Sequence, residues 1–373
     1  METMEVSQQQ QVLKKEDPKI SKYLKKTLLL LNCAMLAIGN CGGPLLMRLY
    51  FVRGGNRIWF SSFLETSGWP LILFPLAASY FYRRRNKGGG DSHDATRLFV
   101  MKPLVFVACT IIGILTGLDD YFYAYGVSRL PVSTSSLIIA SQLGFTAFFA
   151  FLLVKQKFSS YSINSVFLLT VAALMLGLHT SGDRPANESN KQYFIGFFMT
   201  IAASALYGLV LPMVELTYKK AKQAITYTLV MEMQLVICIF ATLFCTIGML
   251  INKDFQVIPR EAREYELGKI KYYVVVTFST IIWQFFFLGS IGVIFYGSSL
   301  LAAVIITTLL PVTEILAVFF FQESFKTEKG ISLALSLWGF ASYFYGEFKA
   351  SNRRNQSPNP KNPHQHHPPS LYV

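Results

Sequence analysis

SSFLET, residues 61–66, places the carboxyl group of Glu65 inside an apolar stretch, and TLVMEM, residues 228–233, does the same with Glu232. The separation between these two stretches recurs elsewhere in the chain. At nearly that spacing stand the pairs Pro44 and Pro212, Tyr50 and Tyr218, Gly126-Val127 and Gly292-Val293, Ser133 and Ser299, and Phe158 and Phe325. This repetition indicates a duplicated structural unit.

The composition is that of a membrane protein. Hydrophobic residues make up 52% of the chain and charged residues only 15%, with a mean hydropathy of +0.40, which is too apolar for a soluble protein of 373 residues. A helix needs about 20 apolar residues to cross the hydrocarbon core of a bilayer. We predict about ten such spans, at residues 27–50, 59–82, 103–125, 131–154, 162–179, 193–218, 224–251, 272–296, 298–320 and 330–348.

Five spans in each copy is an odd number, so the second copy must enter the membrane in the opposite sense to the first. We therefore expect an all-α integral membrane protein of about ten transmembrane helices, arranged as two inverted five-helix repeats. Such repeats are the usual architecture of secondary transporters, whose substrate site lies near the midplane between the halves. The predicted division is an N-terminal segment 1–26, a first repeat 27–179, a linker 180–192, a second repeat 193–348 and a disordered tail 349–373.

Basic residues indicate the orientation of the chain. Most of the 34 Lys and Arg residues fall in segments on the side of the two termini, and such residues favour the cytoplasmic side. Both termini are therefore expected in the cytoplasm, the linker 180–192 outside, and the protein in the plasma membrane. The polar start 1–21 is too long for a cleaved signal peptide, so the first span is expected to remain. The net charge of +13 then reflects topology, and the expected surroundings are membrane lipid rather than nucleic acid.

Motifs of catalysis and metal binding are missing from the sequence. The five cysteines lie in apolar runs without the spacing of a metal site or a disulfide framework. There is no HExxH, GxSxG or GxxxxGK motif. We therefore expect no enzyme activity, no cofactor and no metal.

Two spans carry matching interruptions. The first contains the run Gly39-Asn40-Cys41-Gly42-Gly43-Pro44, and its counterpart in the second repeat contains Gly208-Leu209-Val210-Leu211-Pro212. Broken helices in transporters expose backbone groups to the substrate, but Gly and Pro also serve close packing in membrane helices. Both explanations stay open for residues 208–212, whereas the dense glycine cluster at 39–44 favours a helix break at a cavity.

Carboxyl groups inside a membrane are costly and are therefore functional candidates. Partial desolvation favours the protonated form of a carboxyl group, which suits a proton carrier. The candidates for a coupling proton are Glu65, Asp119, Glu232 and Glu314. The alternative for each is a structural hydrogen bond to a neighbouring helix.

Asp119 and Asp120 are adjacent, so on a helix their side chains point about 100° apart. Only one of them is expected to face a cavity squarely. Asp119 is preferred because it shares a helical face with Tyr123 at i+4. Asp120 is expected to cap a helix or to contact solvent.

Several motifs in the sequence are similar to those of one known family. They are IGNCGGPL at 38–45, RLYF at 48–51, LET at 64–66, YAYG at 123–126, LPVST at 130–134, IIASQL at 138–143, KQY at 191–193, IWQ at 282–284, LLP at 309–311 and SLWGF at 336–340. On these motifs the chain resembles the plant purine permeases of the drug/metabolite transporter superfamily. The resemblance implies a ten-helix fold and proton-coupled uptake of adenine, related purines and cytokinins.

A flat, uncharged heterocycle needs aromatic faces on which to stack and amides that both donate and accept hydrogen bonds. Asn and Gln side chains recognise adenine edges, and stacking contributes roughly 1–3 kcal/mol per base. The amide candidates are Asn40, Gln142, Gln234 and Gln284, and the aromatic candidates are Trp69, Tyr123, Tyr207 and Trp283. Aromatic residues make up 15% of the chain, so packing or lipid contact is the alternative for each ring.

The expected function is that of a secondary transporter that imports substrate and proton by alternating access. One alternative is a carrier of the same superfamily that imports or exports another small aromatic molecule, such as an alkaloid or a vitamin. Another is a channel or a membrane receptor without transport. Accumulation against a gradient distinguishes the carrier from the channel, and ligand binding without flux distinguishes the receptor.

Overall fold

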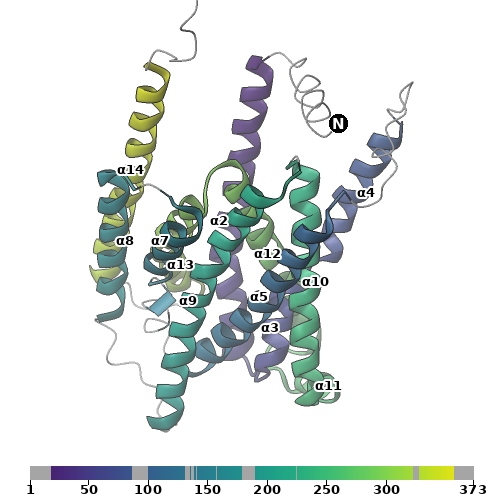
Figure 1. Ribbon diagram of the computed structural model, residues 1–373. Helices are drawn as coiled ribbons and strands as arrows, with labels where there is room; N and C mark the ends of the chain where they lie inside the picture. The colour runs from purple at the N-terminus through teal and green to yellow at the C-terminus, as the bar shows by residue number, and fades with distance from the viewer. Residues whose placement is uncertain are drawn as a thin grey trace, which may run out of the picture.

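The computed structural model describes residues 18–85, 100–130, 135, 138–139, 141–156, 158–178, 190–223, 225–321 and 327–356. Within these ranges the regular elements are all helices (Figure 1). They are α2 (Pro18–Val52), α3 (Ile58–Thr66), α4 (Pro70–Arg85), α5 (Pro103–Arg129), α7 (Gln142–Val154), α8 (Ser160–Leu178), α9 (Asn190–Lys220), α10 (Tyr227–Ile251), α11 (Asp254–Glu264), α12 (Lys269–Tyr296), α13 (Ser299–Phe321) and α14 (Thr327–Gln356).

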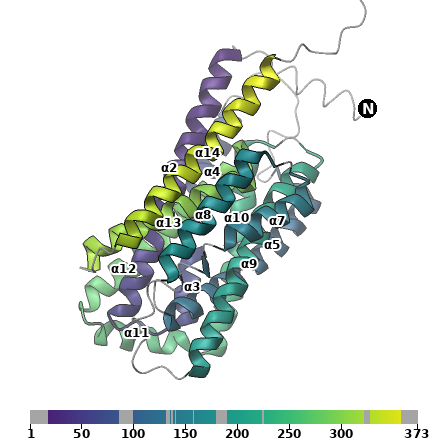
Figure 2. The same cartoon turned by 90° about the vertical axis from the view of Figure 1, so that its left-hand side faces the viewer.

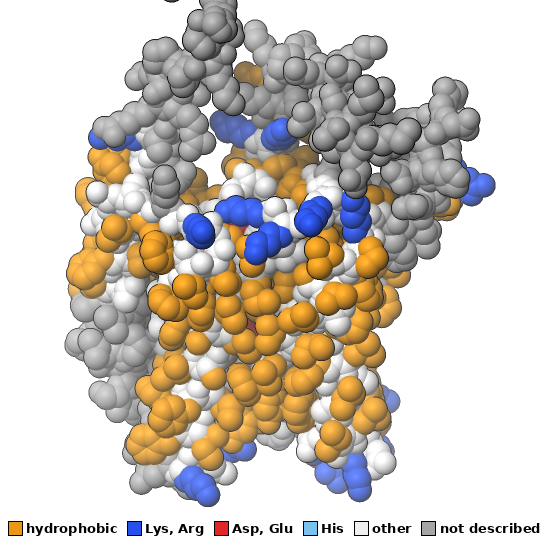
Figure 3. All heavy atoms as spheres, viewed as in Figure 1, with side chains coloured by type: hydrophobic (Ala, Val, Ile, Leu, Met, Phe, Trp, Pro, Cys, Tyr) orange, Lys and Arg blue, Asp and Glu red, His pale blue; other side chains and the backbone are white. Residues whose placement is uncertain are grey.

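Six of the described helices are long and apolar enough to cross a membrane. They lie within α2, α5, α9, α10, α12 and α13. Hydrophobic side chains cover the middle of the visible face, and Lys and Arg gather toward its two ends (Figure 3). This banding is what a hydrocarbon core flanked by headgroups and water requires, and the protein is an all-α integral membrane protein.

The predicted spans and the observed helices differ in several places. Span 59–82 is divided into α3 and α4 by the turn at residues 67–69, where Ile72 N–H donates to Trp69 O. Helix α11 lies between the predicted spans 224–251 and 272–296, where no span was predicted. Helices α2 and α14 extend into the predicted terminal segments, beginning at Pro18 and ending at Gln356. Residues 1–17, 179–189 and 357–373, which include parts of the predicted termini and linker, lie outside the described residues.

The expected break in the first span is wrong, because α2 is one continuous helix through Gly39 and Pro44. Its glycines permit close packing against α12 instead. A Cβ atom at Gly39 would overlap the backbone of Phe286, and one at Gly43 would lie 2.8 Å from the Trp283 ring. Glycine at such positions lets two helix backbones approach each other in a membrane. The contact between α2 and α12 is accordingly the most extensive among the described helices.

Helix α9 shows the same behaviour at the matching position. It continues through Gly208 and Pro212, and a Cβ atom at Gly208 would lie 2.6 Å from the Cβ of Phe145 on α7. Of the two explanations that the sequence left open for this run, close packing is the one that the helix geometry supports. Neither run breaks its helix in this structure.

Helix α11 closes one end of the bundle, opposite the end at which α2 begins (Figures 1 and 2). Its Glu261 is 7% exposed and accepts hydrogen bonds from Tyr50 Oη at 2.6 Å and Tyr272 Oη at 3.0 Å. Arg57 pairs with Asp254 at 3.6 Å. The pKa of the Asp254 carboxyl is raised above its ordinary value because of burial. The Asn252 hydrogen bond and the Arg57 charge act in the opposite direction and offset part of this effect. These contacts attach α11 to α2, to α12 and to the connection before α3.

Replacing Gly39 with Ala is expected to destabilise the protein by about 1–3 kcal/mol, because the added methyl group must push α2 away from α12. The matched control is Gly144→Ala on α7, where a Cβ atom meets nothing within 4 Å. Thermal unfolding of the detergent-solubilised variants measures the difference. Equal unfolding temperatures for the two variants would contradict this account of the α2–α12 contact.

Candidate functional site

A cavity of about 130 Å³ lies among α2, α3, α5, α7, α9, α12 and α13. One buried water needs only about 10–15 Å³ measured in this way, so the cavity can hold a small molecule. On α2 its lining runs from Asn40 to Arg48, and on α5 from Asp119 to Val127. Both stretches lead from mid-helix toward the end of the bundle that carries α11.

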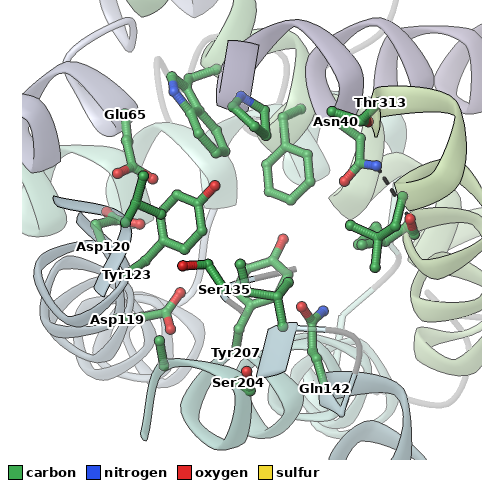
Figure 4. Close-up of a pocket in the computed structure, with 18 of the residues that line it drawn as sticks. Asn40, Glu65, Asp119, Asp120, Tyr123, Ser135, Gln142, Ser204, Tyr207 and Thr313 are labelled. Atoms are coloured by element: carbon green, nitrogen blue, oxygen red, sulfur yellow. Dashed lines mark hydrogen bonds between the residues drawn. The ribbon is translucent and has the colours of Figure 1, made fainter. Parts of the chain in front are cut away.

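Three carboxyl groups gather on one side of the cavity (Figure 4). Glu65 of α3 is 2% exposed, and Asp119 and Asp120 of α5 are 7% and 2% exposed. Each has one buried oxygen without a hydrogen-bond partner among the described residues: Glu65 Oε1, Asp119 Oδ1 and Asp120 Oδ2. Like charges at short range in a medium of low dielectric constant repel strongly. Ionising all three groups together is therefore unfavourable, and the cluster is suited to holding a proton.

The expectation that Asp120 would cap a helix or contact solvent is wrong. Asp119 and Asp120 both line the cavity, and Asp120 lies near Glu65 (Figure 4). Asp120 is held at this place by the contact between α3 and α5, where Ser62 Oγ donates to Asp120 O at 3.3 Å. It is 2% exposed, so it does not contact solvent.

Aromatic rings form the walls of the cavity. Trp283 meets Tyr123 edge-on with a centroid separation of 6.0 Å. Tyr207 of α9 stacks on Phe286 of α12 at 5.7 Å with an interplanar angle of 28°. The indole Nε1 of Trp283 is buried without a partner among the described residues. The walls thus offer flat apolar faces and one free donor.

Amide and hydroxyl groups lie across the cavity from the carboxyl cluster (Figure 4). Gln142 begins α7, is 6% exposed, and its Nε2 lacks a partner among the described residues. Asn40 Nδ2 donates to Ile306 O of α13 at 3.2 Å, which fixes the amide and leaves its oxygen able to accept. Ser135 Oγ, which lies near Tyr123 on the side of the carboxyl cluster (Figure 4), is also buried without a described partner. The opposite wall can therefore both donate to a ligand and accept from it.

Several sequence candidates lie away from this cavity. Trp69 packs against the small cluster of Ile72, Met231 and Leu235. Gln234 Nε2 donates to Cys238 Sγ at 3.0 Å, and Cys238 Sγ lies 3.8 Å from Gln284 Oε1. These two amides therefore belong to a polar contact between α10 and α12. Of the predicted ligand-binding residues, the cavity brings together Asn40, Tyr123, Gln142, Tyr207 and Trp283.

Glu232 also lies outside the cavity lining, and its contacts are structural. Its carboxylate accepts from the backbone N–H of Val100 at 3.0 Å and of Met101 at 3.1 Å, just before α5 begins. A carboxylate at a helix N-terminus satisfies free N–H groups and stabilises the helix dipole. The backbone of Glu314 belongs to α13, but its side chain lies outside the described residues.

Sequence reasoning missed several residues of the lining: Arg48, Ser135, Ser204, Phe286 and Thr313. The sequence showed Arg48 only as part of the motif RLYF, and its guanidinium lies 4.7 Å from the centroid of the Phe321 ring. Ser204 and Thr313 resemble the many hydroxyl residues of apolar helices. Ser204 lies one turn from Tyr207 on α9, and Thr313 lies two turns from Ile306 on α13. That these faces meet the cavity becomes apparent only when the helices are packed.

Comparison with known proteins identifies the family. A family model described as purine nucleobase transmembrane transport matches residues 27–353. Purine permease 3 of Arabidopsis thaliana is 56% identical over 331 residues, which cover 89% of this chain and 93% of the relative. Purine permease 2 of the same plant is 52% identical over 341 residues, covering 88% and 94%.

The chain belongs to the plant purine permease family. The resemblance seen in the sequence is thereby confirmed, and the membership is that of a membrane transporter. A solved crystal structure has a TM-score of 0.54 and 16% identity, with coverage of 87% of this chain and 99% of its own. At that identity the likeness establishes a shared fold alone.

The different surroundings of Glu65 and Glu232 predict different effects on the stability of this purine permease. Glu232→Ala should destabilise the fold by about 1–3 kcal/mol, because the N–H groups of Val100 and Met101 lose their acceptor. Glu65→Ala should leave stability unchanged or increase it, because it removes repulsion within the cluster. Thermal unfolding in detergent tests both, and a larger loss for Glu65→Ala would show that the assignment is reversed.

Proposed function

We propose that the protein imports purine bases, including adenine, and cytokinins together with protons, by alternating access across the plasma membrane. The family membership supports the substrate class. The single observation that carries the coupling is the meeting of a buried carboxyl cluster with aromatic and amide walls in one cavity. A proton and a heterocycle bound there would influence each other's affinity directly.

The proton is proposed to bind within the cluster of Glu65, Asp119 and Asp120. Glu65 is the first candidate because it is almost fully buried and one of its oxygens has no described partner. A carboxyl group that alternates between ionised and neutral forms can accept from a purine N–H in one state and donate to a ring nitrogen in the other. Glu232 is a weaker candidate since backbone N–H groups already hold its carboxylate.

The purine ring is proposed to lie between the Trp283 and Tyr123 edges and the stacked pair of Tyr207 and Phe286. Gln142 then reaches one edge of the ring from α7, and the carboxyl cluster reaches the opposite edge. An amide that donates and accepts is the side chain best matched to an adenine edge. Apolar lining at Leu45, Leu310 and Ala317 offers space for a hydrophobic substituent, as in a cytokinin.

The architecture proposed for this cycle is ten spans in two inverted repeats, 27–179 and 193–348. The pattern of helix contacts supports it. If the two halves are exchanged, α2 corresponds to α9, α5 to α12, α7 to α13 and α8 to α14. The α2–α12 contact then corresponds to α9–α5, the α7–α9 contact to α13–α2, and the α8–α14 pair to itself. All of these contacts are observed. The distribution of basic residues favours both termini in the cytoplasm, so the end of the bundle with α11 is proposed to face outward.

Glu65→Gln tests the coupling site. It should abolish accumulation of adenine driven by an inward proton gradient, because an amide cannot take up and release a proton. Exchange of external for internal adenine at equal pH should persist, since the cavity keeps its shape. The measurement uses radiolabelled adenine and purified protein in liposomes, and uphill accumulation in this variant would exclude Glu65 from coupling.

Gln142→Ala tests the recognition of the ring. Loss of the amide should weaken adenine binding about tenfold, which corresponds to one or two hydrogen bonds. Gln234→Ala is the matched control, because Gln234 is equally buried in the membrane region but does not line the cavity. Titration calorimetry or scintillation proximity binding gives both affinities, and equal affinities would leave Gln142 as a packing residue.

A further inference from the structure

Buried side chains fill the bundle between the cavity and the end opposite α11. On α13, Leu300, Ala302, Ala303 and Val304 are at most 1% exposed. Leu36 of α2 and Val293 of α12 are fully buried, and Val214 of α9 is 4% exposed. A substrate in the cavity therefore has no passage toward this end unless α9 and α13 separate.

One carboxylate holds α9 and α13 together at that end. Glu215 of α9 is 7% exposed. Its Oε2 accepts from the backbone N–H of Ser299 at 2.8 Å and from Ser299 Oγ at 2.6 Å, at the first residue of α13. A carboxylate that accepts from the first residue of a helix satisfies a backbone N–H group that has no partner within the helix.

Lys219 extends this contact to a third helix. Its Nζ lies 2.9 Å from Glu215 Oε1, one helical turn away. The same Nζ donates to Val154 O, the last residue of α7, at 3.4 Å. The four residues Val154, Glu215, Lys219 and Ser299, here called the inner latch, thus join the ends of α7, α9 and α13.

The latch lies in line with the cavity. Ser299, Ala303 and Ile306 follow one another at i, i+4 and i+7, so they share one face of α13. Ile306 lines the cavity and accepts the Asn40 hydrogen bond. A displacement that carries Ser299 away from α9 would therefore open the face that leads from the end of the bundle to the cavity.

We propose that the inner latch is the gate that keeps the cytoplasmic end closed while the cavity is loaded, and that Glu215 positions α13 in the closed form. The proposal rests on the alternating access of the proposed function. Release of substrate to the cytosol then requires that Ser299 leaves the Glu215 carboxylate. Glu215 touches neither the purine nor the coupling proton in this scheme.

The test measures how often the closed half opens. Cysteine is introduced by Ala303→Cys at a fully buried position between the latch and the cavity. N-ethylmaleimide labels it in the detergent-solubilised full chain without substrate, and peptide mass spectrometry locates the label, so the five native cysteines can remain. Glu215→Gln should raise the labelling rate at position 303 by about tenfold, because loss of the charged acceptor favours the open form.

The matched control is Glu261→Gln. Glu261 is also 7% exposed and also accepts from hydroxyl groups, but it lies at the α11 end. Its substitution should leave labelling at position 303 within twofold of the parent. An equal rise in both variants would indicate general loosening and would overturn the proposal, as would an unchanged rate in Glu215→Gln.

A milder variant covers the case in which Glu215→Gln does not fold. Ser299→Ala removes the hydroxyl donor and keeps the backbone N–H, so it should raise labelling by a smaller factor of about three. No rise in a Ser299→Ala protein that elutes as a single species would overturn the proposal. Labelling needs neither substrate nor a proton gradient. A negative labelling result would therefore contradict the latch and not the proposed purine import. A failure of purine import would likewise not alter a positive labelling result.

Discussion

The repulsion among Glu65, Asp119 and Asp120 is the constraint on which the account of this protein depends. A carboxylate in the membrane interior is costly to ionise, and three of them around one cavity cannot share a low-dielectric site as full charges. A proton, a ligand N–H group or both must compensate them. The aromatic and amide walls opposite make a purine base the ligand that suits this need.

Glu65 and Glu232 lie in similar apolar stretches of the sequence, but their surroundings differ. Glu232 accepts from two backbone N–H groups just before α5, so the fold compensates its charge. Glu65 lines the cavity, and one of its oxygens has no partner among the described residues. This difference makes Glu65 the better candidate for a group that changes its protonation during transport.

The membrane class, the six spans that correspond to long apolar helices and the family could be predicted from the sequence, because apolar run length and local motifs are properties of the chain alone. The side of each helix that faces the cavity could not be predicted. Trp283 and Gln284 are adjacent, yet only Trp283 lines the cavity. Helices that are apolar on nearly all sides carry no amphipathic pattern that would reveal their rotation. The glycine run 39–44 does lie at the cavity, since Asn40 and Pro44 line it, but the expected helix break is absent, because close packing and helix breaks use the same residues.

Asp120 is a second case in which the sequence did not reveal that a side chain faces the cavity. The 100° between adjacent side chains suggested that only one of them would face the cavity squarely, but both Asp119 and Asp120 line it. Only the packing of α3 against α5 and α10 brings Asp120 and Glu65 together (Figure 4). Residues such as Ser135 and Thr313 join the site by the same route, through neighbours that are distant in the sequence.

The measurement that tests the central claim most directly is uptake of radiolabelled adenine by the unmodified protein in liposomes, with an inward proton gradient and with the same gradient dissipated by an uncoupler. The account predicts accumulation above the external concentration only while the gradient persists. Equal uptake in both conditions, in protein shown to be folded, would contradict proton coupling through the carboxyl cluster.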